Sequence, residues 1–130
     1  MAAALLLAGC GSLPAARDAM DTPLAPSGDA ARGREVFVTR EAGHCVLCHE
    51  VPGAEAFGNV GPSLVGVGSR LSVPQLRLRV ADITKVDADA AMPTFHRVDR
   101  MTRVDSRYEG KPVLTGQQVE DVVAYLATLR

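Results

Sequence analysis

The chain has 130 residues and a formal net charge of −1, and only 4% of its residues are aromatic, with no tryptophan. This length fits one domain of about 100–150 residues with a tail, and the near-neutral charge argues against nucleic acid or an anionic membrane surface as a partner. No run of about 18 apolar residues is present, so we expect no segment that crosses a bilayer. Aromatic side chains can therefore supply little of a core.

The amino end carries the signals of an exported protein. Residues 2–8 form a short apolar run, and Leu7-Ala8-Gly9-Cys10 resembles the lipobox of bacterial lipoproteins, whose cysteine becomes lipid-modified. The positively charged start of a secretory signal is missing, because no basic residue precedes Arg17. The alternative is an ordinary signal peptide with an incidental Cys10. Both interpretations place the protein in the periplasm, and the first adds a membrane tether through the lipidated Cys10.

A linker is expected after the signal. Pro14, Pro23 and Pro26 lie among small and polar residues that show no hydrophobic period. We therefore divide the chain into an export signal at residues 1–9, a flexible tether at residues 10–28 and a domain at residues 29–130.

The domain opens with a predicted helix. Ala30, Gly33, Val36 and Phe37 have the spacing of one buried helical face, and Ser27 or Asp29 is a suitable N-cap. Glycine inside a helix costs about 1 kcal/mol relative to alanine. Close approach of a second helix at Gly33 would account for that cost.

Cys45-Val46-Leu47-Cys48-His49 predicts a covalent attachment site for one haem c. Two thiols three residues apart can each bond one vinyl group of the porphyrin, and the following His49 is then held as an axial iron ligand. A redox-active dithiol with an incidental histidine is the alternative. A zinc site is disfavoured because no second pair of ligands accompanies the cysteines.

Two further helices are predicted in the second half of the chain. A short one is expected over residues 73–83, with Leu76, Val80 and Ile83 on one face. The last has a capping box formed by Thr115 and Gln118. Its entry is closed by a hydrophobic staple of Leu114 and Val119, and it continues as an apolar stripe through Val122, Val123, Leu126 and Leu129. We expect it to cross the first helix at Gly33 and Phe37.

The irregular region 87–112 contains the candidates for the second axial ligand of the iron. Met92 precedes Pro93 and is therefore held extended, so that its thioether can project onto the open face of the haem. Met101 and His96 are the rivals, and the plainest alternative makes Met92 a filler of the core.

Two further features have a structural and a functional interpretation. Pro62 is either a plain turn residue or the residue whose carbonyl accepts a hydrogen bond from Nδ1–H of His49 and so orients the imidazole. The run of Arg97, Arg100, Arg103 and Arg107 is either a solvated face or a set of partners for haem propionates or for an acidic protein surface.

Several motifs together resemble class I cytochromes c: the CxxCH, Gly61-Pro62-x-Leu64, the Met92 loop and the run from Asp121 to Leu126. Within them, residues 58–68, 75–80, 92–97 and 110–126 resemble the SoxX family, the monohaem subunits of SoxAX complexes. The resemblance implies an all-α, class I cytochrome c-like fold of three to four helices packed around one covalent haem c.

The resemblance to SoxX also implies a function and partners. It implies a heterodimer with a SoxA-type cytochrome in periplasmic thiosulfate oxidation, in which this chain passes electrons to a diffusible c-type cytochrome. It also assigns the sulfur chemistry to the larger partner. Cys10, Cys45 and Cys48 are the only cysteines, so no thiol remains for that chemistry and the chain is not expected to be an enzyme on its own. The alternatives are an independent electron shuttle and, if Met92 does not bind iron, a five-coordinate ligand sensor.

Overall fold

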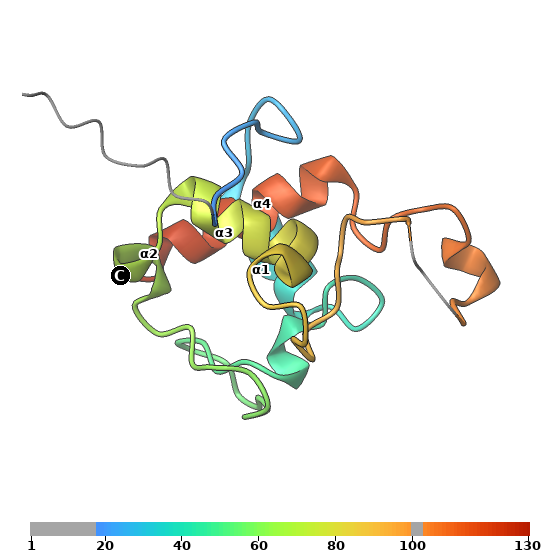
Figure 1. Cartoon of the computed structure of the whole chain (residues 1–130). Coiled ribbons are helices and arrows are strands. Elements are labelled where there is room, and N and C mark those ends of the chain that lie inside the picture. The colour runs from blue at the N-terminus through green and yellow to red at the C-terminus, as the bar shows by residue number, and fades with distance from the viewer. Residues whose placement is uncertain (1–17, 100–102) are drawn as a thin grey trace, which may run out of the picture.

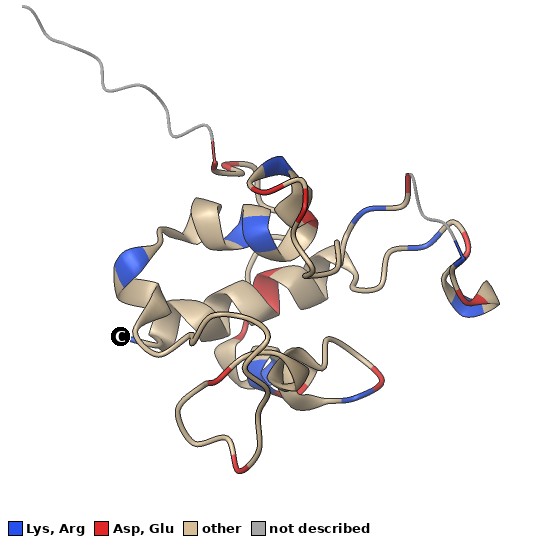
Figure 2. Ribbon diagram, turned by 60° about the horizontal axis from the view of Figure 1, so that its bottom comes forward, with Lys and Arg blue, Asp and Glu red and all other residues tan. Residues whose placement is uncertain are grey.

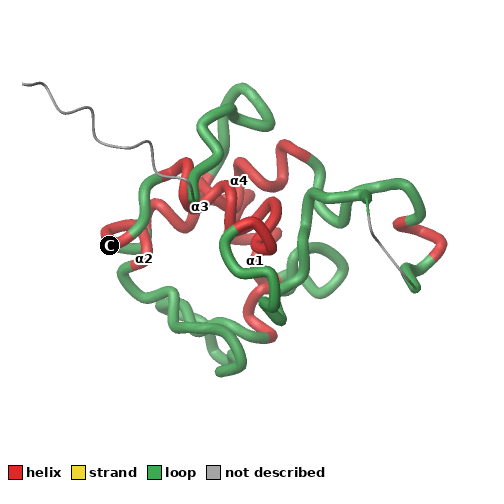
Figure 3. The backbone as a smooth tube through the Cα atoms, viewed as in Figure 1, coloured by secondary structure: helices red, strands yellow, loops and turns green. Residues whose placement is uncertain are grey.

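Four α-helices joined by long loops make up the described part of the chain (Figures 1 and 3). The structure is a computed structural model that describes residues 18–99 and 103–130. The expected signal with Cys10, and the rival ligand Met101, lie outside these residues. The helices are α1 (Ala30–Val38), α2 (Val67–Arg70), α3 (Val73–Asp82) and α4 (Gly116–Thr128), with short 3-10 turns at η1 (Cys45–Leu47), η2 (Ile83–Lys85) and η3 (Ser106–Tyr108). The described ranges contain no strand, and the predicted all-α fold is confirmed.

Helices α1 and α4 cross at close range. Asp29 is the N-cap of α1, and its carboxylate accepts a hydrogen bond from the backbone N–H of Arg32. A Cβ at Gly33 would overlap the backbone carbonyl of Asp121 on α4, so glycine allows the two backbones to touch. One turn later the ring of Phe37 meets that of Tyr125 edge to face, with centroids 5.5 Å apart. The predicted crossing at Gly33 and Phe37 is therefore confirmed.

Helix α4 begins where the capping pattern predicts. The hydroxyl of Thr115 accepts from the backbone N–H of Gln118, and the side chain of Gln118 accepts from the N–H of Thr115. Leu114 and Val119 are both buried, with 1% and 0% of their surface exposed, and form the predicted staple. The apolar stripe of the helix then faces the core.

Helix α3 also begins with a reciprocal capping box, formed by Ser72 and Gln75. Helix α2 is a single turn that the sequence analysis did not predict. It lies against the end of α4, where the backbone N–H of Gly68 donates to the carbonyl of Leu129 over 2.8 Å. A side chain at Gly68 would collide with the carbonyl of Ala127. Tertiary contact, rather than local propensity, therefore forms this turn.

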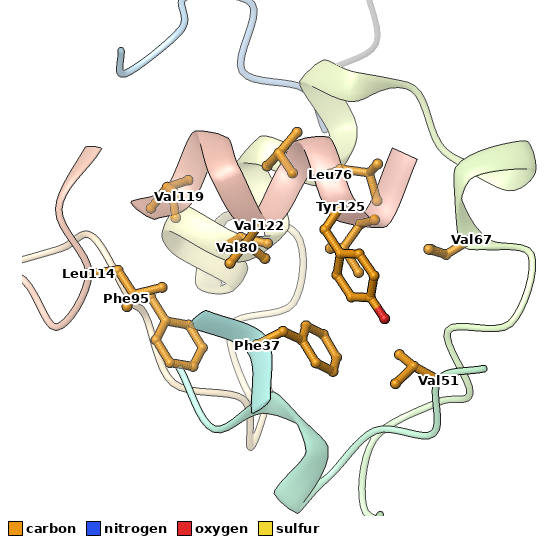
Figure 4. Packing of buried hydrophobic residues seen from close by; sticks show 13 residues of the cluster. Phe37, Val51, Val67, Leu76, Val80, Phe95, Leu114, Val119, Val122 and Tyr125 are labelled. Atoms are coloured by element: carbon orange, nitrogen blue, oxygen red, sulfur yellow. The ribbon is translucent and has the colours of Figure 1, made fainter. Parts of the chain in front are cut away.

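The core lies between α1, α3 and α4 (Figure 4). Val51 and Val67 extend it toward the loops that follow the CxxCH segment. No helix of the described residues is long and apolar enough to cross a membrane. The buried apolar residues are Phe37, Val51, Val67, Leu76, Val80, Ala81, Phe95, Leu114, Val119, Val122, Val123, Tyr125 and Leu126.

Residues 18–28, which the sequence analysis assigns to the tether, lie against α3 and α4. The carbonyl of Met20 accepts from the Arg77 guanidinium over 2.8 Å, and the N–H of Leu24 donates to the Glu120 carboxylate over 2.9 Å. The pattern of prolines and small residues carries no sign of these contacts, because the partners lie more than 50 residues away. The division of the chain at residue 28 stays a prediction.

A buried ion pair fastens this segment. Nε of Arg77 lies 2.6 Å from Oε1 of Glu120, and Nη2 lies 3.0 Å from Oε2. The two side chains are only 5% and 6% exposed. Burial alone would raise the pKa of Glu120, but hydrogen bonds from Arg77 and from the N–H of Leu24 outweigh burial and lower it. The stability contributed by Glu120 is thus present above the pKa of the unfolded state and is lost as the pH falls through the lower folded-state pKa.

We predict that Glu120→Gln destabilises the fold by about 3 kcal/mol, because it leaves the buried Arg77 without a charge partner. Chemical denaturation at neutral pH measures the loss. The variant should also lose part of the acid sensitivity of the wild type, since the titrating group is gone. Asp105→Asn is the control, because it breaks the exposed Asp105–Arg107 pair and should leave stability unchanged. Equal stability of the Glu120→Gln variant and the wild type would show that the pair does not fasten the fold.

Candidate haem attachment site

The CxxCH segment folds into a 3-10 turn that brings its functional side chains together. The backbone N–H groups of Cys48 and His49 both point to the carbonyl of Cys45, at 3.1 and 3.0 Å. Cys45 and Cys48 are both free thiols. Burial raises the pKa of the Cys45 thiol to about 12. A redox-active dithiol has a lowered thiol pKa instead, so this environment argues against that alternative.

The imidazole of His49 is buried and held in one orientation. Its Nδ1 lies 2.7 Å from the backbone carbonyl oxygen of Pro62, and the residue is 9% exposed. Because a carbonyl only accepts, Nδ1 carries the proton and donates it, which leaves Nε2 with a free lone pair. The contact that the sequence analysis expected between His49 and Pro62 is therefore present.

Backbone bonds hold the Pro62 carbonyl in place on both sides. The N–H of Gly61 donates to the carbonyl of Cys48, and the N–H of Leu64 donates to the carbonyl of Glu50, both over 2.9 Å. The segment after Pro62 is further held by Arg70, whose guanidinium donates to the carbonyls of Val65 and Ser63. This role of Arg70 is not predictable from the sequence, because nothing in its spacing distinguishes it from a surface residue.

Two glycines let the loop approach the CxxCH turn. A Cβ at Gly61 would overlap the imidazole ring of His49, and a Cβ at Gly58 would overlap the carbonyl of Leu47. The N–H of Gly58 also donates to the carbonyl of Val46 over 2.8 Å. In the sequence these two glycines stand out only as part of a family motif. Gly58 and Gly61 before Pro62 are the sequence signal that the loop backbone comes close to another part of the chain.

Met92 is half-buried and packs against the core, as does Cys45. The chain beyond it is anchored, because Leu114 donates its N–H to the carbonyl of Phe95 over 2.8 Å. His96 is used differently: its N–H donates to the carbonyl of Ala81, and its Nδ1 lies 2.8 Å from the carbonyl of Leu114. This contact of His96 has the same form as that of His49, and the assignment of the second axial ligand to Met92 stays a prediction.

Two arginines of the run form ion pairs with nearby aspartates. Arg97 binds Asp99 through two hydrogen bonds of 2.7 and 2.8 Å, and Arg107 binds Asp105 over 3.0 Å. Arg103 is exposed, and Arg100 lies outside the described residues. For Arg107 the exposed pair favours the solvated-face interpretation. Arg97 is only 21% exposed and also donates to the hydroxyl of Thr84 over 3.0 Å, so its guanidinium joins neighbouring parts of the fold.

The donor set fits a covalently attached haem. Two free thiols flank a short turn, and a buried imidazole follows them with Nδ1 engaged and Nε2 free. The overlap that any Cβ at Gly61 would make with the ring shows that the loop is shaped around one imidazole position. A backbone carbonyl that accepts a hydrogen bond from Nδ1–H fixes the orientation and basicity of a ligating histidine.

Comparison with known proteins agrees with this chemistry. The family model described as Cytochrome c matches residues 30–130. The crystal structure of SoxXA from P. pantotrophus contains a similar chain, with 34% identity and a TM-score of 0.79, covering 88% of this chain and 91% of that one. The c-type cytochrome SorU from Sinorhizobium meliloti is 27% identical with a TM-score of 0.51, covering 77% of this chain and 88% of that one. No curated protein sequence matches the chain significantly.

We predict that Gly61→Ala displaces the His49 ring, because the new methyl group and the imidazole cannot share one position. The haem-loaded variant should lose the spectrum of a low-spin, six-coordinate iron or accumulate less attached haem. Optical spectroscopy and pyridine haemochrome yield measure both. Asn59→Ala, at a neighbouring exposed position, is the control and should behave as the wild type. A Gly61→Ala protein with unchanged spectrum and haem content would show that the loop does not constrain the ring.

Proposed function

The chain belongs to the cytochrome c family and, within it, to the SoxX family, and from this premise we propose that it is the electron-transfer subunit of a periplasmic, thiosulfate-oxidising SoxAX-type complex. It receives electrons from the haem site of a SoxA-type partner and delivers them to a diffusible c-type cytochrome. The observation that carries the proposal is the CxxCH turn, whose imidazole is held by Pro62, in a chain 34% identical over most of its length to one in SoxXA.

The cofactor is one haem c, which supplies a one-electron iron couple when bound. Cys45 and Cys48 would hold it through two thioether bonds, so that the haem stays attached between turnovers. His49 would bind the iron through Nε2, and the hydrogen bond from its Nδ1–H to Pro62 would raise its basicity. Met92 would supply the second axial ligand, a thioether that favours the reduced iron.

The chain does not perform the sulfur chemistry itself. Cys45 and Cys48 are committed to the porphyrin, and Cys10 lies in the expected leader. Oxidative coupling of thiosulfate to a carrier-protein cysteine therefore takes place at the partner. This chain only removes the electrons that the coupling releases.

Export and anchoring are part of the proposal and have their own test. The amino end supports a periplasmic protein tethered through a lipid on Cys10, because the residues before that cysteine follow the lipobox pattern. Intact-mass measurement of the mature protein should find a lipidated cysteine as its first residue. Cleavage at another position, or an unmodified thiol, would contradict the tether and leave the electron-transfer role unaffected.

We predict that Met92→Ala abolishes the methionine-to-iron charge-transfer band of the oxidised protein and lowers its reduction potential, because the thioether that favours reduced iron is gone. Met20→Ala is the matched control, since Met20 is also half-buried and packs against the core but lies in the segment held by Arg77. A band that survives in the Met92 variant would refute the assignment of this ligand.

The partner is tested by purification of the tagged protein from cells grown on thiosulfate. We expect a larger c-type cytochrome to co-purify, and the haem of this chain to become reduced when thiosulfate and the carrier protein are added. A lone haem protein that stays oxidised would contradict the subunit role and favour an independent periplasmic electron shuttle.

A further inference from the structure

The chain that follows Met92 is fixed to two different helices. The N–H of His96 donates to the carbonyl of Ala81 in α3 over 3.1 Å. The N–H of Leu114, just before α4, donates to the carbonyl of Phe95 over 2.8 Å. The loop that carries the predicted iron ligand is therefore held three and four residues after Met92.

The imidazole of His96 completes this junction. Its Nδ1 lies 2.8 Å from the carbonyl oxygen of Leu114, and because a carbonyl only accepts, Nδ1 carries the proton and donates it. Leu114 thus donates to Phe95 through its N–H and accepts from His96 through its carbonyl. His96 joins both helices at once, because its backbone N–H reaches α3 and its ring reaches the residue before α4.

The bond from the ring also satisfies a buried carbonyl. Leu114 is 1% exposed, and the hydrogen-bond ladder of α4 begins one residue later, where the carbonyl of Thr115 accepts from the N–H of Val119 over 3.0 Å. A donor for the carbonyl of Leu114 must therefore come from outside the helix. His96 provides it, and a side chain of the same shape without a donor would leave this buried acceptor unpaired.

The residues on the other side of Met92 are held more loosely. Asp87, Ala88 and Asp89 are exposed, and the backbone bond formed here is local, from the N–H of Ala90 to the carbonyl of Asp87 over 3.2 Å. Segments with exposed backbone bonds and few buried contacts are the ones that open most easily. The position of Met92 thus depends chiefly on the attachment that follows it.

Charged contacts extend this attachment beyond His96 on the side of α3. The Arg97 guanidinium donates to the hydroxyl of Thr84 over 3.0 Å and lies 3.5 Å from the carboxylate of Asp82. Figure 2 shows the charged positions of this segment on the ribbon that leads to the grey trace. These contacts join the segment to the end of α3, whereas the ring of His96 joins it to the start of α4.

We infer that His96 is the positioning residue for the second axial ligand: its bond to Leu114 holds the Met92 loop, so that the thioether keeps one place against the iron. The inference rests on the proposed function, in which Met92 is that ligand. Hydrogen-bonded supports of this kind keep a ligand in its productive geometry. They also limit the rearrangement that is needed when the iron changes its oxidation state.

Haem-loaded variants of His96 test the inference through the binding of cyanide to the oxidised iron, which requires the thioether to leave first. His96→Phe keeps a planar ring without a donor and should bind cyanide about tenfold faster than the wild type. Its methionine-to-iron charge-transfer band should weaken and its reduction potential should fall. His96→Asn is the matched variant, because its amide N–H takes the place of Nδ1–H, and it should stay close to the wild type in all three measurements.

Glu120→Gln is the control for a loss of stability away from the loop, since its partners are Arg77 and Leu24, and it should leave the rate of cyanide binding unchanged. If His96→Phe does not fold, His96→Gln replaces it. The amide N–H of that variant stands in the place of Nε2, so it should bind cyanide faster than the His96→Asn variant.

A His96→Phe protein that binds cyanide at the wild-type rate would overturn the inference. Equal acceleration in the His96→Asn or the Glu120→Gln variant would also overturn it, because the effect would then not come from the donor at Nδ1. A wild type that lacks the methionine band would instead contradict the assignment of Met92 in the proposed function.

Discussion

The close crossing of α1 and α4 is the contact on which the rest of this small protein depends. It requires Gly33, because any side chain there would overlap the carbonyl of Asp121. The side-chain carboxylate of Asp121 also binds the start of α1. It accepts hydrogen bonds from the N–H of Asp29 and from the guanidinium of Arg32, over 2.8 and 2.9 Å. Backbone contact and side-chain pairing thus set the position of α1, and the CxxCH turn follows a few residues after α1 ends.

Helix α4 combines an apolar face with two buried carboxylates, and the two faces serve different purposes. Its valines, Leu126 and Tyr125 form the core. Glu120 and Asp121 reach the opposite way, to Arg77 and to Arg32, and fasten residues 18–28 and α1. The cost of burying these carboxylates is outweighed because each accepts several hydrogen bonds, and those bonds lower the pKa of both groups.

The haem attachment loop is organised by a different principle from the helices. Backbone hydrogen bonds and glycines, rather than apolar burial, place Pro62 against His49, and Arg70 holds the carbonyls beyond it. This leaves large apolar side chains such as Val60 and Leu47 in solvent.

Local patterns in the sequence determined the helix limits, the caps and the CxxCH motif, because each depends on residues only three or four positions apart. The crossing at Gly33 was also predictable, since a costly glycine in a helix implies close packing. Three features could not be predicted from the sequence: the turn α2, the Arg77–Glu120 pair and the docking of residues 18–28. The residues that contact one another in the pair and in the docked segment are 43 to 96 positions apart, and no local pattern encodes such contacts. Only the tertiary structure decided which distant backbones meet, and therefore which polar groups had to be paired.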